Sequence, residues 1–201
     1  MITQESLLLR QRSRAVSRQA FLFARNFFRY PKLLGSVVPS SPFLVRHLLS
    51  LIDWRRARIV VEYGPGVGTL TREILKRIGP EATLVAIELN PEFVEFLQNE
   101  IHDPRFRIVY GSAADVRSIL QKLNLPHADY IISGIPYTLL PDRIRRVVTR
   151  ESHYVLHPQG AFLVYQFTRT VLPYLKAIFG HVQQDFKLLN ILPAHIYLCT
   201  P

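Results

Sequence analysis

The sequence predicts an α/β fold in which a mostly parallel β-sheet is covered by helices on both faces. From about residue 59 onward, short runs rich in β-branched and aromatic residues alternate with helix-like segments. A glycine-rich turn directly follows the first of these runs. The chain has 201 residues, which suits one domain with an appendage and is enough to bury a sizeable core.

Five runs have the composition of parallel strands, and the segments between them have the composition of helices. The strands are expected at Ile59–Tyr63, Thr83–Leu89, Phe106–Tyr110, Tyr130–Ser133 and Ala161–Phe167. The helices are expected at Thr69–Ile78, Pro91–Ile101, Ala114–Leu123 and Pro141–Val155. Asn90 suits the N-cap of the second helix and Pro91 its first turn, where the missing N–H of proline would be unpaired anyway.

The end of the chain predicts an antiparallel hairpin. A helix near Pro173–Phe179 precedes two strand-like runs, Phe186–Ile191 and His195–Cys199. Only residues 192–194 separate these runs, and a parallel return needs a crossover of about a dozen residues or more, so the two strands must pair antiparallel. The sheet is therefore expected to have seven strands and to close with this hairpin.

The chain carries a net charge of +10 at neutral pH, and most of it belongs to the N-terminal quarter. Eleven Lys and Arg residues against two Asp and Glu residues precede Ile59, which leaves one net positive charge for the rest. A basic segment attached to a near-neutral body indicates an anionic partner, either nucleic acid or a membrane surface. Hydrophobic residues at 48% and charged residues at 20% exclude a disordered or fibrous chain.

The cysteine content and the length of the apolar runs indicate which cellular compartment to expect. Cys199 is the single cysteine, which excludes an intramolecular disulfide and a multi-cysteine metal site. No cluster has metal-ligand spacing, so no metal is expected. No apolar run approaches the ~20 residues that span a bilayer, and Leu7–Leu9 is too short for the core of a signal peptide. We therefore expect a cytoplasmic protein.

The glycine-rich turn has the sequence Glu62-Tyr63-Gly64-Pro65-Gly66-Val67-Gly68-Thr69. Glycines let the backbone turn sharply and let a ligand approach main-chain N–H groups. The dinucleotide fingerprint would need a glycine at Thr69, and a phosphate-binding loop would need Gly-Lys-Ser/Thr, so neither pattern fits. A purely structural strand-to-helix turn is the alternative.

Glu88 lies at the tip of the second predicted strand, 20 residues beyond Gly68. A carboxylate there can accept hydrogen bonds from both ribose hydroxyls of a nucleoside, whereas a capping or solvated glutamate is the alternative. With this loop, strand and acid, the chain resembles the class I S-adenosylmethionine-dependent methyltransferases from Ile59 to Cys199. The resemblance implies a Rossmann-like seven-stranded methyltransferase sheet and S-adenosylmethionine as cofactor.

The resemblance also implies which residues hold the cofactor. The glycines would pass under it, Glu62 would lie near its amino-acid end, and Glu88 would hold its ribose. The family often has an acidic residue beside the adenine at the position of Ser112, so adenine recognition by the backbone and Ser112 is expected. The implied cofactor-binding residues are Glu62, Gly64, Gly66, Gly68, Glu88, Leu89, Ser112, Ala113 and Ser133.

The loop after the fourth predicted strand, Ser133-Gly134-Ile135-Pro136-Tyr137, should face the transferred methyl group, because ligands of such sheets bind at the carboxyl ends of the strands. Enzymes that methylate an adenine amino group resemble this stretch, but they carry Asn or Asp at the position of Gly134 and bind the amine with its side chain and a backbone carbonyl. An rRNA or other nucleic-acid adenine N6-methyltransferase is therefore an alternative that Gly134 disfavours.

The Ser-Gly-Ile-Pro version, together with Gly35-Ser36-Val37-Val38-Pro39-Ser40-Ser41, is similar to the bacterial phospholipid N-methyltransferases. These enzymes convert phosphatidylethanolamine stepwise to phosphatidylcholine. The resemblance implies a catalytic loop of Gly134, Ile135 and Pro136. It also makes Tyr137 the leading candidate for contact with the amine, with packing beside Pro136 as the alternative. The candidate residues for the lipid headgroup are Tyr30, Ser40, Ser41 and Arg46.

The N-terminal segment predicts an amphipathic helix with an arginine stripe opposite an apolar face. The apolar face holds Leu9, Val16, Ala20, Phe23 and Phe27. The opposite face holds Arg14, Arg18, Arg25 and Arg29. Such a helix can lie in the headgroup plane of a membrane, and docking on its own domain as a cover of the pocket is the alternative.

The expected organisation is a basic helical extension over residues 1–50 and a methyltransferase domain over residues 51–201. The expected partners are anionic membrane lipids and phosphatidylethanolamine, with the protein held peripherally at the inner face of the cell membrane. A lipid-binding module without enzymatic activity is a further alternative, which the intact glycine loop and Glu88 oppose.

Overall fold

A computed structural model of the chain describes residues 42–187 and 194–201. Several predictions fall on the remaining residues and lie outside the described part. They concern the N-terminal amphipathic helix with Arg14, Arg18, Phe23, Arg25 and Phe27, and the headgroup candidates Tyr30, Ser40 and Ser41. Arg46 lies within it, as does the domain predicted over residues 51–201 apart from residues 188–193.

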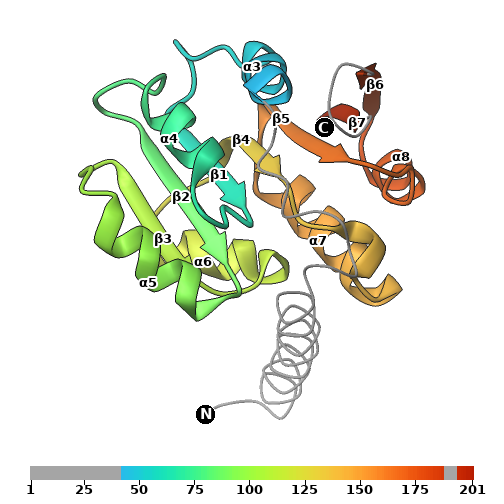
Figure 1. Cartoon of the computed structure of the whole chain (residues 1–201). Coiled ribbons are helices and arrows are strands. Elements are labelled where there is room, and N and C mark those ends of the chain that lie inside the picture. The colour runs from blue at the N-terminus through green and yellow to red at the C-terminus, as the bar shows by residue number, and fades with distance from the viewer. Residues whose placement is uncertain (1–41, 188–193) are drawn as a thin grey trace, which may run out of the picture.

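Within these residues, seven strands form one sheet in the order β3-β2-β1-β4-β5-β7-β6 (Figure 1). The strands are β1 Ile59–Tyr63, β2 Thr83–Glu88, β3 Phe106–Tyr110, β4 Ala128–Ser133, β5 Leu156–Gln166, β6 His181–Lys187 and β7 Ala194–Thr200. Strands β1 to β5 pair in parallel, and β7 is antiparallel to both β5 and β6. The predicted parallel sheet with a closing antiparallel hairpin is confirmed.

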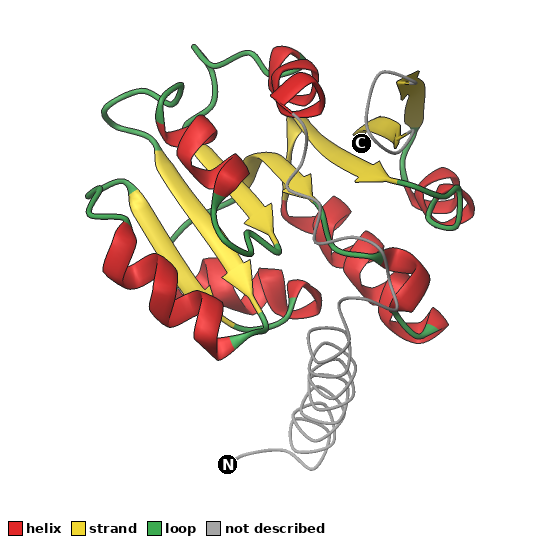
Figure 2. Cartoon of the chain, viewed as in Figure 1, coloured by secondary structure: helices red, strands yellow, loops and turns green. Residues whose placement is uncertain are grey.

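Helices cover both faces of this sheet (Figure 2). The helices are α3 Pro42–Ser50, α4 Thr69–Leu75, α5 Pro91–Glu100, α6 Val116–Lys122, α7 Asp142–Val155 and α8 Leu172–Ile178. One core cluster joins α3 and α4 to one face, and a second joins α6, α7 and α8 to the other. The central strands are apolar on both sides, as a doubly covered parallel sheet requires.

Local signals in the sequence account for the helix that follows β2. The side chain of Asn90 accepts a hydrogen bond from the backbone N–H of Glu92 at 2.9 Å, and Pro91 occupies the first position of α5. The predicted N-cap and first turn are therefore confirmed. Pro91 fits there because its fixed backbone angle suits the helix and its missing N–H would have had no intrahelical partner.

The hairpin strand β6 begins earlier than the sequence predicts. The expected strand was Phe186–Ile191, whereas β6 spans His181–Lys187, and residues 188–191 lie outside the described part. The run from His181 is polar and resembles a loop, but β6 is an edge strand that pairs on one side with β7 only. An edge strand tolerates such polar residues because water solvates its outer side.

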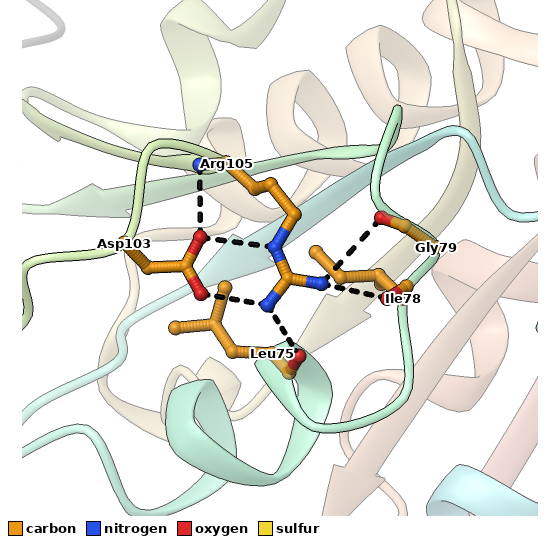
Figure 3. Close-up of polar contacts among 5 residues, drawn as sticks. All are labelled: Leu75, Ile78, Gly79, Asp103 and Arg105. Carbon is orange, nitrogen blue, oxygen red and sulfur yellow. Dashed lines mark hydrogen bonds and ion pairs between the residues drawn. The ribbon is translucent and has the colours of Figure 1, made fainter.

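The amino edge of the sheet is tied together by one guanidinium group (Figure 3). Arg105, just before β3, donates to the carbonyls of Leu75 and Ile78 at 2.8 Å each, where α4 ends. Its other N–H groups bind the Asp103 carboxylate at 2.6 and 2.9 Å. The carbonyls in the last turn of a helix lack intrahelical partners, so Arg105 satisfies that of Leu75. It also bonds Ile78 in the turn that follows α4, and it thereby connects this helix end to the start of β3.

The strand order places a ligand site at one edge. The chain proceeds outward from β1 to β2 and β3, then returns to the other side of β1 with β4 and β5. The carboxyl ends of β1, β2 and β4 point toward the same edge of the molecule (Figure 1). In open α/β sheets, ligands bind at the carboxyl ends of the strands beside such a reversal.

Candidate active site

The glycine-rich turn after β1 is a left-handed backbone segment that only glycine adopts freely. Gly64, Gly66 and Gly68 have φ values of 70°, 55° and 79°. A Cβ at Gly64 would lie 2.9 Å from Ile135 Cγ2, and one at Gly68 would lie 2.6 Å from Leu97 Cδ2. At Gly66 a Cβ would meet no atom within 4 Å. This glycine therefore faces open space, where a ligand can approach the main chain.

Glu88 joins this turn to the end of β2. Its carboxylate accepts hydrogen bonds from the backbone N–H of Gly66 at 3.1 Å and of Asn90 at 2.9 Å. Burial raises the pKa of this carboxyl, and the backbone donors oppose the rise. Each carboxylate oxygen has a second acceptor site in addition to its backbone partner. The group is thus held in place with acceptor capacity left for two ribose hydroxyls.

Glu62 is the second buried carboxyl of the site. It is 2% exposed, and its Oε2 accepts a hydrogen bond from the hydroxyl of Thr71 on α4 at 2.7 Å. Burial raises its pKa to about 8, opposed by the hydrogen bond from Thr71 and reinforced by the charge of Glu88. An ionised carboxyl in this place is costly without a cation, so Glu62 fits the amino group of a zwitterionic ligand.

The predicted adenine side of the site follows β3. Ser112 is 3% exposed, and its hydroxyl accepts a hydrogen bond from the backbone N–H of Ala114 at 3.2 Å. It thereby caps the short 3₁₀ turn Ala113–Asp115. Leu89, at the end of β2, is half-buried. Ser112 and Ala113 thus lie at the carboxyl end of β3, next to the Glu88 segment to which β3 is paired.

The loop after β4 is held by a residue that the sequence analysis missed. The buried side chain of Gln166 accepts a hydrogen bond from the backbone N–H of Tyr137 at 3.2 Å and donates one to the carbonyl of Ile135 at 2.8 Å. Arg145 on α7 donates to the carbonyl of Tyr137 at 2.8 Å. The backbone of residues 135–137 is therefore fixed from β5 and from α7.

Tyr137 points into the core. It is 0% exposed and belongs to the cluster that lies under α7 and α8. Burial raises the pKa of its phenol. The hydroxyls of Tyr137 and Ser133 are neighbours, but neither makes a hydrogen bond of ordinary geometry within the described residues. This location fits packing beside Pro136, which is the alternative role predicted for Tyr137.

Tyr165 is the aromatic residue that stands over the loop after β4. It lies near the carboxyl end of β5, where Ser133 of β4 pairs with Val164. A Cβ at Gly134 would overlap the Tyr165 hydroxyl and lie 2.6 Å from its Cζ atom. The ring is partly buried and packs on the cluster under α3 and α4. Local sequence patterns do not reveal this neighbour, because Gly134 and Tyr165 are 31 positions apart in the chain.

Arg46 lies on the exposed side of α3, with its guanidinium 5.0 Å from the ring centre of Phe43. His47, on the same helix, contacts Asp185 of β6 at 2.7 Å. Asp185 pairs with Ile196, which pairs with Tyr165. This register places α3 beside the carboxyl end of β5, and ligands of open α/β sheets bind at that edge.

A pocket of about 380 Å³ lies at the other edge of the sheet. Its lining residues include Arg55, Arg56 and Arg58, which precede β1, and Asp129 and His157, which lie at the starts of β4 and β5. Asp129 accepts hydrogen bonds there from the backbone N–H groups of Arg58 and Ile59. This pocket is separate from the site of the glycine loop, since it adjoins the amino ends of the strands.

The fold and these two carboxyls define a class I S-adenosylmethionine-dependent methyltransferase. Comparisons with known proteins support the same class. Residues 60–160 match the family model described as a methyltransferase domain, and the chain belongs to this family. An ornithine lipid N-methyltransferase of Singulisphaera acidiphila is 32% identical over 181 residues, which are 89% of this chain and 94% of the relative.

Other relatives share a smaller part. The ribosomal RNA small subunit methyltransferase A of Clostridium perfringens is 32% identical over 123 residues, 56% of this chain and 41% of the relative. An O-methyltransferase from Bacillus cereus in complex with S-adenosylhomocysteine has a TM-score of 0.65 at 12% identity, covering 89% of this chain and 90% of that one. Human methyltransferase-like protein 13, also with S-adenosylhomocysteine, has a TM-score of 0.59 at 17% identity, covering 78% and 79%.

The cofactor is thus S-adenosylmethionine, and the residues present fit it. Two buried carboxyls with raised pKa values flank the turn at Gly66, which a Cβ does not fill. Across residues 42–187 and 194–201, no group of His, Cys, Asp and Glu has the arrangement of a metal site. In that same part of the chain, no helix is long and apolar enough to cross a membrane.

Proposed function

We propose that this protein methylates the amine of a membrane lipid, with phosphatidylethanolamine and its partly methylated forms as substrates. The observation that carries the proposal is the match to an ornithine lipid N-methyltransferase over 94% of that relative's length. That name describes methylation at a nitrogen atom of a lipid. The Ser133-Gly134-Ile135-Pro136 motif supports an amine-bearing phospholipid through its resemblance to the phospholipid N-methyltransferases.

The bound cofactor supplies an activated methyl group on sulfonium. The protein's own residues bind, orient and exclude water, which accounts for a large part of such a rate enhancement. Glu62 and Glu88 fix the two ends of the site, and Gln166 holds the loop at Ile135 against the end of β5. In this assignment the loop of Gly134, Ile135 and Pro136 lines the path of the amine.

The substrate side of the domain suits a lipid surface. Three apolar side chains at the carboxyl edge are exposed: Phe43 by 64%, Val67 by 43% and Phe167 by 40%. Arg46 stands beside Phe43 and Arg169 follows Phe167, so cations accompany the apolar groups. Apolar side chains next to arginines can enter the headgroup region of an anionic membrane.

An adenine N6-methyltransferase acting on ribosomal RNA is the second candidate. The match to ribosomal RNA small subunit methyltransferase A and the Pro136-Tyr137 pair favour it. The glycine at position 134 opposes it, because the adenine enzymes bind the amine with a polar side chain at that position. The short coverage, 41% of that relative, also makes it the weaker candidate.

The transfer of labelled methyl groups to three kinds of substrate tests the proposal. The full chain is given S-adenosylmethionine with phosphatidylethanolamine vesicles, ornithine lipid vesicles or ribosomal RNA, each in a separate reaction. We expect transfer to phosphatidylethanolamine, with mono-, di- and trimethylated products resolved by chromatography. Transfer to ornithine lipid alone would support lipid N-methylation and contradict the phospholipid assignment, and transfer to RNA alone would contradict both.

A further inference from the structure

We propose that the hydroxyl of Tyr165 is the group that accepts a hydrogen bond from the substrate amine, in the position that an Asn or Asp side chain at residue 134 would fill. The assignment rests on the proposed function and adds to it a residue that holds the amine. It starts from the overlap between a Cβ at Gly134 and the Tyr165 side chain.

Gly134 is a glycine for steric reasons. The described glycines with positive φ are Gly64, Gly66 and Gly68, so the backbone at Gly134 is open to other residues. A Cβ at Gly134, however, would lie 2.6 Å from Cζ and 3.1 Å from Cε1 of Tyr165 and would overlap the hydroxyl. A side chain at residue 134 and the Tyr165 ring therefore exclude each other.

The surroundings fix the backbone that carries the Tyr165 side chain. Strands β4 and β5 pair in parallel through Ser133 and Val164, so Gly134 and Tyr165 are the next residues of two neighbouring strands. The side chain of Gln166 donates to the carbonyls of both Tyr165 and Ile135, at 2.7 and 2.8 Å. The loop that faces the cofactor and the base of the Tyr165 ring therefore form one rigid unit.

The glycine turn of the cofactor site adjoins the same unit. A Cβ at Gly64 would lie 2.9 Å from Ile135 Cγ2, so this turn is in close contact with the loop after β4. Gly134 also donates its N–H to the carbonyl of Tyr63 at 3.3 Å. The hydroxyl over Gly134 thus stands at the junction of β1, β4 and β5, where the cofactor and the amine must meet.

A phenol suits a lipid amine better than a carboxamide does. The amine of adenine is planar and rigid, and an amide can bind its edge at a fixed angle. A lipid amine is tetrahedral and rotates freely, so one acceptor oxygen is enough to direct its lone pair toward the methyl group. The face of the Tyr165 ring also attracts the cationic methylated products.

In this assignment Tyr165 positions the amine and takes no part in the bonds that form and break. The ammonium first gives one proton to water. The lone pair of the neutral amine then forms the N–C bond. The S–C bond breaks in the same step, and the electron pair of the S–C bond stays on sulfur. A neutral primary amine has two N–H groups, a monomethylated amine has one, and a dimethylated amine has none to donate to Tyr165.

Tyr165→Phe tests the hydrogen bond, because it removes the hydroxyl and keeps the ring. With phosphatidylethanolamine and its mono- and dimethylated forms as separate substrates, we expect kcat/KM to fall about 10- to 100-fold for the first two. The third methylation should change by less than about threefold, since its neutral amine has no N–H. Affinity for S-adenosylmethionine, measured by calorimetry, should stay within about twofold of the unmodified protein.

Tyr154→Phe is the matched control. Tyr154 is near the end of α7, 60% exposed, and its hydroxyl accepts a hydrogen bond from Arg117. All three methylations should keep their rates in this variant. An equal loss at all three steps of Tyr165→Phe, or no loss at any step, would overturn the assignment while leaving the proposed function intact. Absence of lipid methylation by the unmodified protein would overturn both.

Gly134→Ala tests the steric overlap between a side chain at residue 134 and Tyr165 without an activity assay. In the unmodified background the new methyl group overlaps the Tyr165 hydroxyl, so the midpoint of thermal unfolding should fall by several degrees. In a Tyr165→Ala background the same change should have a much smaller effect, since the ring is gone. Equal shifts in both backgrounds would show that the two side chains do not compete for this space.

Discussion

At the scale of single residues, the burial of the Glu62 carboxyl has an electrostatic cost, and we expect the bound cofactor to relieve it. Glu62 is buried beside a second carboxyl, and its pKa is raised to about 8. In the free protein at pH 7 this carboxyl is therefore mostly protonated. The positive amino group of a bound ligand favours the ionised form, so binding and ionisation of Glu62 are coupled.

Glu62 should make cofactor binding depend on pH. Because binding favours ionised Glu62, the Kd for S-adenosylmethionine should rise as the pH falls from 8 to 6, by up to about tenfold per unit. Glu62→Gln should bind more weakly at pH 8 and lose this part of the dependence. Titration calorimetry of both proteins across this range measures the difference, and since the ligand's own titration is common to both, it cancels.

The same substitution has an opposite effect on folding. A pKa raised from 4.5 to about 8 means that the ionised form is disfavoured in the folded state, so stability falls as the pH rises through this window. Glu62→Gln should therefore unfold at a higher temperature than the unmodified protein at pH 8 and at a similar temperature at pH 4. A lower midpoint for the variant at pH 8 would contradict the assigned burial cost.

At the scale of elements, Arg105 shows how a side chain outside the site holds the sheet edge. Arg105→Ala leaves the carbonyls of Leu75 and Ile78 without a donor and should reduce the free energy of unfolding by about 2 kcal/mol. The cofactor Kd should be unchanged, because this contact lies at the amino edge of the sheet. Denaturant unfolding and calorimetry measure the two quantities.

The control for Arg105 is another arginine that pairs on the surface. Arg146 contacts Asp142 one helical turn away on α7, at 2.8 Å, and both side chains are more than half exposed. Such pairs add little to stability, so Arg146→Ala should leave the unfolding midpoint within experimental error. If both substitutions shift the unfolding midpoint equally, Arg105 stabilises the fold no more than a surface charge does. Its contact with the end of α4 then adds no stability.

Local sequence patterns predicted most of the helices and strands. They did not predict contacts between residues that are distant in the sequence. The spans of β1 and β3 agree with prediction, because both are short runs rich in β-branched and aromatic residues. The glycine turn and Glu88 also follow from local sequence. Edge strand β6 was misplaced because solvation removes the hydrophobic signal. Tyr165 and Gln166 were missed because they act on a loop of another strand.

At the scale of the whole molecule, the carboxyl edge of the sheet combines the cofactor site with the exposed apolar groups. We expect Phe43→Ser combined with Phe167→Ser to weaken cosedimentation with anionic vesicles several-fold, because both side chains would lose contact with the lipid. Methylation of a detergent-dispersed short-chain lipid should be affected much less. The two readouts separate attachment from chemistry.

Tyr154→Ser is the control for attachment, since Tyr154 is 60% exposed and lies near the start of β5 at the amino edge. It should sediment with vesicles as the unmodified protein does. Equal loss for this variant would show that no particular edge faces the membrane. Removal of residues 1–29 separately tests the amphipathic helix that the sequence predicts there, and unchanged sedimentation would exclude this segment as the anchor.

The position of β7 between β5 and β6 constrains the order in which the domain can be assembled. During synthesis β6 leaves the ribosome first, yet its hydrogen-bonding partner is β7, which is made after it. Until β7 arrives, β5 also keeps an open edge beside Tyr165 and Gln166. We therefore expect methyltransferase activity to appear only after β7 has been translated, so that a nascent chain stalled before residue 194 is inactive.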